Sequence, residues 1–164
     1  MEKKTTKSSA QYLTMAGVIA AIYVVLTFVA QAFGLASGAI QFRLSEMLTV
    51  LPMFTTAAIP GLTIGCLLAN ILTGCAAWDV VFGSLATLIG ALGTRLLRRT
   101  ENPYLGVIPP IASNMLIVPA VLQKVYGAPE SYWYLLVTVG IGEVVCCGVL
   151  GVLLYKSFKK HKVL

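Results

Sequence analysis

The chain has 164 residues, of which 58% are hydrophobic and 11% are charged, and its mean hydropathy is +0.88. A water-soluble domain of this composition would expose a largely apolar surface and aggregate, so the sequence predicts an all-α integral membrane protein with a single domain over residues 1–164. The net charge of +6 does not indicate nucleic-acid binding, because ten of the twelve basic residues lie in three clusters: Lys3, Lys4 and Lys7; Arg95, Arg98 and Arg99; Lys156, Lys159, Lys160 and Lys162.

Apolar runs separated by turn signals predict six transmembrane helices, since a helix needs roughly 17 to 25 residues to cross a bilayer. In chain order they cover about residues 12–33, 41–56, 59–74, 79–98, 105–124 and 131–156. The stretches between them contain Gly, Pro or a candidate helix cap: FGLASG, AIPG, TGCAAWD, RRTENP and YGAPES. The second run is short, and Pro52 within it is expected to bend or end a helix.

An even number of spans places both termini on one side of the membrane, together with the loop between the fourth and fifth spans. All three basic clusters then fall on that side, which the positive-inside rule identifies as cytoplasmic. Residues 1–11 and 157–164 are accordingly predicted to be basic cytoplasmic tails. A cleaved signal peptide ending near "AQA" (residues 30–32) is an alternative, but the first apolar run is longer than a usual signal core.

The sequence gives no indication of an enzyme, a metal site or a bound cofactor. The four cysteines, Cys66, Cys75, Cys146 and Cys147, lack C-x-x-C spacing and fit small packing residues, and His161 is the only histidine. There is no phosphate-binding G-x-x-x-x-G-K-[ST] stretch and no Ser-His-Asp constellation. If transport is driven by ATP, another chain must hydrolyse it.

Few strongly polar side chains remain near the predicted spans: Arg43, Glu46, Asn70, Asp79, Asn114 and Glu143. Glu143 lies about 18 Å along the sixth helix and therefore near the midplane of the bilayer. Intramembrane carboxylates usually mark a substrate, ion or proton site. Because the set as a whole leans toward the extracellular half, it predicts a cavity that opens outward.

Most of these polar residues also have a purely structural interpretation. Arg43 and Glu46, three residues apart on one helix face, fit an ion pair that anchors the helix end or shapes the mouth of a cavity. Asp79 fits a helix N-cap beside an interfacial tryptophan. Asn70 and Asn114 fit hydrogen bonds between helices.

The first predicted helix carries two pairs of small residues spaced four apart, Ala16 with Ala20 and Gly17 with Ala21. Such a face lets another helix approach closely. The partner helix belongs either to another protein or to this chain.

Three segments resemble the QueT family: IQFRLSEMLTVLP (residues 40–52), AIPGLTIGCLLANIL (residues 58–72) and WDVVFGSLATLIGA (residues 78–91). QueT proteins are substrate-binding S-components of energy-coupling factor (ECF) transporters in bacterial cell membranes. The resemblance implies a six-helix subunit that captures its ligand from outside and works with a transmembrane coupling subunit and two ATPases. It also implies that Ala16 and Ala20 dock on the coupling subunit, and that the ligand is a queuosine precursor or queuine, a 7-deazaguanine base.

A deazaguanine offers a ring N–H beside an exocyclic amine, and one carboxylate accepts both hydrogen bonds. We therefore expect Glu143 to bind this edge, with Asn70 and Asn114 meeting the remaining ring groups. Asp79 or Glu46 is then expected to meet a cationic aminomethyl substituent.

Three alternatives stay open. The first is an S-component for another flat vitamin, such as riboflavin or folate. The second is a proton-coupled carrier that acts alone and titrates Glu143. The third is a membrane scaffold that binds no small ligand.

Overall fold

A computed structural model describes the backbone of residues 2–35 and 40–161 and the side chains of residues 9–35 and 40–161. Lys3, Lys4, Lys7 and Lys162 therefore lie outside the residues whose side chains are described, as does part of each predicted tail. In these ranges the chain is helical and forms no strand, which confirms the all-α prediction. The helices are α1 (Glu2–Ala32), η1 (Leu44–Met53), α2 (Ala58–Leu72), α3 (Ala77–Leu96), η2 (Leu97–Thr100), α4 (Pro103–Gly106), α5 (Ile108–Lys124), α6 (Tyr132–Glu143), η3 (Val144–Gly151) and α7 (Val152–His161).

Four helical stretches in the described part of the chain are long and apolar enough to cross a membrane: Ser9–Ala32, Ala77–Thr100, Pro103–Lys124 and Tyr132–His161. They correspond to the first, fourth, fifth and sixth predicted spans. The two remaining apolar helices, η1 and α2, have 10 and 15 residues. The chain is thus a helical membrane protein, while the six-span count and the single-domain boundary stay predictions.

The second predicted span differs most from the structure. Instead of a helix over residues 41–56, a 3-10 helix, η1, runs from Leu44 to Met53. At about 2.0 Å per residue it is roughly 20 Å long, shorter than the hydrocarbon core of a bilayer, which is about 30 Å thick. Eight of its ten residues are buried, and it contacts α1, α2, α3, η3 and α7. This segment is therefore surrounded by the other helices rather than by lipid.

Glycines on the last long helix make room for the segment that contains η1. A Cβ atom at Gly142 would collide with the backbone carbonyl of Gln41, and one at Gly151 would lie 3.3 Å from the carbonyl oxygen of Met47. The helix also widens there, because the π-helical η3 joins α6 to α7 directly after Glu143. Such π-helical turns often occur at functional sites.

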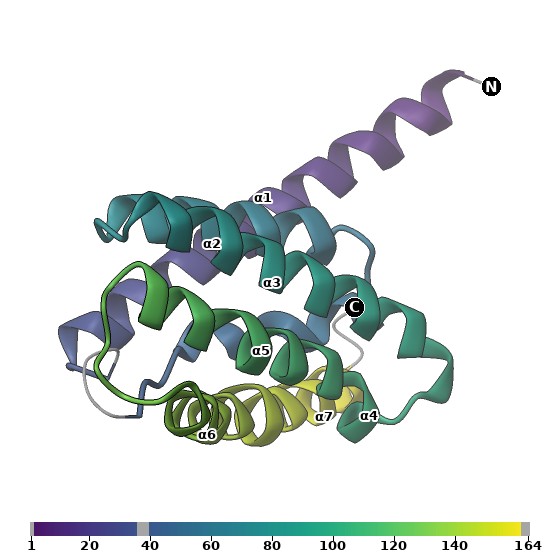
Figure 1. Ribbon diagram of the computed structural model, residues 1–164. Coiled ribbons are helices and arrows are strands. Elements are labelled where there is room, and N and C mark those ends of the chain that lie inside the picture. Colours follow the sequence, from purple (N-terminus) through teal and green to yellow (C-terminus); the bar gives the residue numbers. More distant parts are fainter. Residues whose placement is uncertain (1, 36–39, 162–164) are drawn as a thin grey trace.

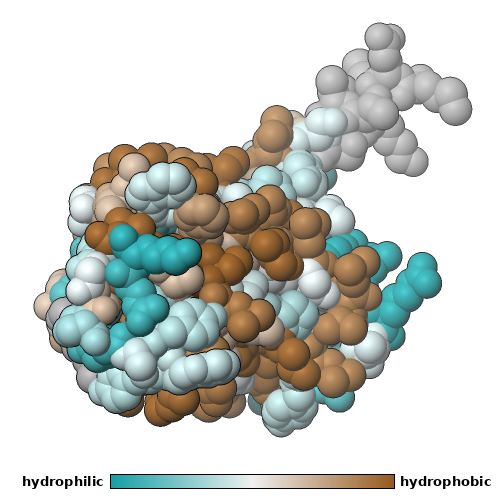
Figure 2. Space-filling view, in the orientation of Figure 1, coloured by the Kyte–Doolittle hydropathy of each residue, from teal (hydrophilic) through white to brown (hydrophobic). Residues whose placement is uncertain are grey.

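The described residues of the two later basic clusters collect at one end of the bundle, which we call the basic end, whereas Arg43 and Lys124 lie elsewhere. The connection between α3 and α4, with Arg98 and Arg99, lies there beside α7 (Figure 1). Lys159 of α7 forms an ion pair of 2.9 Å with Glu101 in that connection. The α2–α3 and α5–α6 connections lie at the opposite end, which we call the loop end. Figure 2 shows hydrophobic residues over the middle of the visible face and hydrophilic ones toward these two ends.

Helices α1 and α2 pack closely through small residues. A Cβ atom at Gly65 of α2 would lie 3.0 Å from the Cα atom of Ala20, and one at Gly61 would lie 2.8 Å from the carbonyl oxygen of Ala16. Ala16 and Ala20 are consequently only 8% and 7% exposed. Gly17 is exposed and would have nothing within 4 Å of an added Cβ atom.

We expect Gly65→Ala to lower the melting temperature of the purified protein in detergent, because the added methyl group would overlap α1. Overpacking of this kind costs about 1–3 kcal/mol. Gly17→Ala is the matched control and should leave the melting temperature unchanged or slightly higher, since Ala favours a helix over Gly. Equal effects of the two substitutions would contradict the α1–α2 packing.

Candidate functional site

A cavity of about 340 Å³ lies at the loop end, between α1, the segment before η1, α2, α3 and the end of α5. This volume is within the range of small-molecule sites. Three of the predicted site residues line it: Arg43, Asn70 and Asp79. The other polar side chains in its lining are Thr27, Gln31, Gln41, Thr73 and Tyr126.

Hydrogen bonds link the polar side chains around this cavity. Arg43 Nη2 donates to Asn70 Oδ1 at 3.3 Å, and Asn70 Nδ2 donates to the backbone oxygen of Asp79 at 3.3 Å. The Tyr126 hydroxyl donates to Asp79 Oδ2 at 3.2 Å and accepts from the backbone N–H of Ala76 at 3.0 Å. Tyr126 thereby ties the α5–α6 connection to the start of α3.

The Tyr126 hydroxyl is held in its protonated form. Its partial burial, followed by the nearby charge of Asp79, raises the pKa of this hydroxyl above its ordinary value. Tyr126 thus remains a hydrogen-bond donor to Asp79 throughout the physiological pH range.

The structural interpretations proposed for Arg43 and Asp79 do not hold. Arg43 forms no ion pair within 4 Å with Glu46; between described side chains, that distance is met by Lys159 and Glu101. Helix α3 begins after Ala76, which occupies the N-cap position, so Asp79 is the third residue of the helix and not its cap. Its carboxylate still lies in the first turn, where the helix dipole favours a negative charge.

The other three predicted site residues, Glu46, Asn114 and Glu143, lie deeper in the bundle. Together with Tyr23 and Cys147 they form a group that we call the buried cluster. Glu46, Asn114 and Glu143 are 0%, 1% and 4% exposed. Asn114 Nδ2 donates to Glu143 Oε1 at 3.0 Å, and Cys147 Sγ donates to Glu143 Oε2 at 3.1 Å. The Tyr23 hydroxyl donates to Glu46 Oε1. The helices η1, α5 and α6 thus bring together three residues that are far apart in the sequence.

The buried cluster has more hydrogen-bond acceptors than donors. Within the described part of the chain, Glu46 Oε2 and Asn114 Oδ1 are the buried side-chain oxygen or nitrogen atoms without a hydrogen-bond partner. Each carboxylate oxygen of Glu143 accepts one bond in the structure, although a carboxylate offers about four acceptor positions. A buried acceptor without a donor costs about 1–3 kcal/mol, more for a charged group. The arrangement is therefore complementary to a group that carries several donors.

Arg43 connects the cavity with the buried cluster. It lines the cavity and is close enough to both Glu46 and Asp79 for their charges to interact. Glu143 and Asn114 are not among the side chains that line the cavity. The structure thus divides the predicted site residues into two groups, and the role of each residue in binding stays a prediction.

The buried cluster also has the donor atoms of a small metal site. One carboxylate oxygen of Glu46, one of Glu143 and the Cys147 sulfur all lie within 4.8 Å of one another. Two oxygens and one sulfur atom are ligands that Zn²⁺ accepts. The sequence predicted no metal site, and the absence of a metal stays a prediction.

Sequence reasoning missed Tyr23 and Tyr126. Tyr23 lies within an apolar helix, where nothing marks its hydroxyl as the partner of a carboxylate twenty-three residues later. Tyr126 lies in the predicted break YGAPES, and its contact with Asp79 depends on the antiparallel arrangement of α3 and α5. Cys147 was interpreted only as a small packing residue, although its spacing of four residues from Glu143 places both on one helix face.

Asn114→Ala should destabilise the ligand-free protein by about 1–3 kcal/mol, because Glu143 would lose its amide donor in a buried position. Reversible unfolding in detergent and denaturant measures this change. Gln123→Ala on the same helix is the control: its amide bonds the backbone of Glu130 near the surface, so a change within about 0.5 kcal/mol is expected. If Asn114→Ala were as mild as the control, the bond to Glu143 would contribute little to stability.

Comparison with known proteins identifies the family. A model of the QueT transporter family matches residues 13–160. The Queuosine precursor transporter QueT of Lactococcus lactis subsp. cremoris is 37% identical over 100 residues, which are 60% of this chain and 58% of that protein. The aligned part thus spans less than two thirds of that relative's length. No solved structure matches the chain. Because the family model covers most of its length, the chain belongs to the QueT transporter family.

Proposed function

We propose that this chain is the membrane-embedded substrate-binding subunit of an ECF-type transporter, which captures a queuosine precursor or queuine from outside the bacterial cell. It would deliver this 7-deazaguanine base inward with a coupling subunit and two ATPases. Family membership and the name of the Lactococcus relative support the substrate class.

The observation that carries the proposal is the excess of buried acceptors around Glu143. A deazaguanine edge presents a ring N–H and an exocyclic amine side by side, which together offer three donor hydrogens. Glu143, the free Glu46 Oε2 and the free Asn114 Oδ1 offer acceptors within one buried cluster. Pairing these donors with these acceptors would satisfy groups that the ligand-free protein leaves unpaired.

The 340 Å³ cavity would then be the entrance to this cluster. Asp79 supplies a carboxylate in its lining for a cationic aminomethyl substituent, and Arg43 is close enough to both this carboxylate and Glu46 for their charges to interact. A ligand that moves past Arg43 would exchange hydrogen bonds with Asn70 on the way. In this account Arg43 gates access to the cluster.

The sidedness of the proposal follows from the positions of the charges. The described arginines and lysines of the two later clusters lie at the basic end, and the cavity lies at the loop end. Under the positive-inside rule the basic end faces the cytoplasm, so the cavity opens to the outside.

Docking on the coupling subunit needs a free helix face. Ala16 and Ala20, the residues expected to dock, are packed against α2, whereas Gly17 and Ala21 on the neighbouring face of α1 are exposed. We therefore place the docking face on Gly17 and Ala21 and leave Ala16 and Ala20 to internal packing.

A proton-coupled carrier remains the second candidate, because the paired carboxylates Glu46 and Glu143 are also what a proton relay would use. That function requires transport in proteoliposomes that contain this chain alone and no ATP. The proposed S-component would bind its ligand under those conditions without net transport.

Glu143→Gln should weaken binding of queuine in detergent at least roughly tenfold, because a hydrogen bond to a charged group contributes about 1.5–3 kcal/mol. Isothermal titration calorimetry with the purified protein measures the affinity. Glu130→Gln is the control, since it removes an exposed carboxylate near the loop end and should leave the affinity unchanged. Unchanged binding by Glu143→Gln would rule out Glu143 as the residue that reads the base.

Ala21→Leu should abolish uptake of labelled queuine in cells that contain the partner subunits, while binding in detergent is kept, because the bulky side chain would hold a docking helix away. The control is Ala112→Leu, an identical change at an exposed position on α5. Normal uptake by Ala21→Leu would place the docking face elsewhere.

A further inference from the structure

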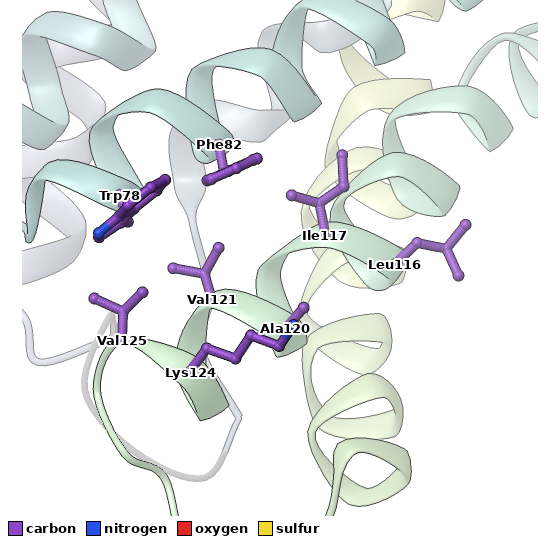
Figure 3. A pocket seen from close by; sticks show the side chains of 8 residues that line it. All are labelled: Trp78, Phe82, Leu116, Ile117, Ala120, Val121, Lys124 and Val125. Atoms are coloured by element: carbon purple, nitrogen blue, oxygen red, sulfur yellow. The ribbon is translucent and has the colours of Figure 1, made fainter.

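A groove on the outer surface of α3 and α5 is separate from the cavity and from the buried cluster. It has a volume of about 540 Å³ and lies near the loop end. Trp78 and Phe82 of α3 form one side, stacked with ring centroids 5.7 Å apart. Leu116, Val121 and Lys124 of α5 line the facing side (Figure 3). Apart from Lys124, all of its lining side chains are hydrophobic.

Lys124 is the feature that distinguishes this groove from an ordinary lipid-facing surface. Its side chain is exposed, and no described residue forms an ion pair or hydrogen bond with its ammonium group. Figure 3 shows the side chain lying along α5 toward Ala120. A cation that borders an apolar groove at the end of a membrane helix is complementary to an anionic headgroup whose acyl chain fills the groove.

The aromatic residues agree with this position at the edge of the membrane. Trp78 is 61% exposed in the first turn of α3, and Tyr126 follows the end of α5 two residues after Lys124. Trp and Tyr are enriched at membrane–water interfaces, where their rings lie at the level of the headgroups. Lys124 is therefore at the depth where a lipid phosphate is expected.

The groove and the cavity share one wall. Trp78 and Val125 line the groove, while their neighbours in the chain, Asp79 and Tyr126, line the cavity and are joined by the 3.2 Å hydrogen bond. An occupant of the groove would thus lie directly behind this part of the cavity wall.

We propose that this groove is a binding site for one anionic phospholipid, with an acyl chain between Trp78, Phe82 and Val121 and its phosphate on Lys124. The site is independent of the proposed transport function. A lipid bound in the groove would hold the start of α3 against the end of α5, behind the hydrogen bond between Asp79 and Tyr126.

Tryptophan quenching tests this proposal in the full-length protein. The chain has two tryptophans, and Trp133→Phe leaves Trp78 as the single fluorophore. This variant is reconstituted into vesicles of phosphatidylcholine that contain a small fraction of brominated phosphatidylglycerol or brominated phosphatidylcholine. We expect brominated phosphatidylglycerol to quench Trp78 with about fivefold higher apparent affinity, the value of one lysine near an anionic headgroup.

Lys124→Gln in the same background should remove this preference, and Lys160→Gln, which deletes an exposed lysine at the basic end, should retain it. Equal quenching by the two brominated lipids would overturn the proposal, since it indicates contact with bulk lipid only. A preference that survives in Lys124→Gln would also overturn it, because another cation would then hold the headgroup.

Discussion

The structure depends on the burial of two carboxylates, Glu46 and Glu143, at the centre of a helical bundle. Removing a carboxylate from water costs several kcal/mol unless hydrogen bonds or an opposite charge compensate it. The protein supplies part of that compensation through Tyr23, Asn114 and Cys147. Two acceptor atoms in the cluster have no donor, so the compensation is incomplete. Unsatisfied buried polar groups are uncommon in native structures, and the ligand of the proposed function would supply the missing donors.

The unusual backbone of the protein serves the same cluster. A 3-10 helix of ten residues is uncommon, and η1 carries Glu46 inside the bundle between the long helices. The glycines at 142 and 151 let this segment approach, and the π-helical η3 follows Glu143 directly. Together these elements bring Glu46 and Glu143 into one buried cluster.

Hydrophobic length and charge placement were sufficient to predict the four long helices and the position of the two later basic clusters at one end. Glu143 and Asn114 were both identified from their polarity within apolar runs, and the structure places them in hydrogen-bond contact. The sequence could not reveal that η1 is shorter than a membrane span, because a buried 3-10 helix and a lipid-exposed α-helix have the same apolar composition. The sequence also could not distinguish the two small-residue faces of α1, Ala16 with Ala20 and Gly17 with Ala21. Only the structure shows that α2 packs against the first pair.

The separation of the cavity from the buried cluster was equally beyond sequence reasoning. Arg43 and Glu46 are three residues apart, but the guanidinium group bonds Asn70 in the cavity wall while the carboxylate bonds Tyr23 in the core. This division gives each group a separate task in our account. In the proposed function, the outer residues would admit and orient a ligand, and the inner carboxylates would recognise its donor edge.

An experimental structure of the protein with queuine bound would test the central claim most directly. Our account predicts that the ring N–H and the exocyclic amine lie within about 2.7–3.2 Å of the Glu143 carboxylate, with Glu46 or Asn114 as a further acceptor. A base held entirely in the outer cavity, with Glu143 still bonded to Asn114 and Cys147, would contradict it.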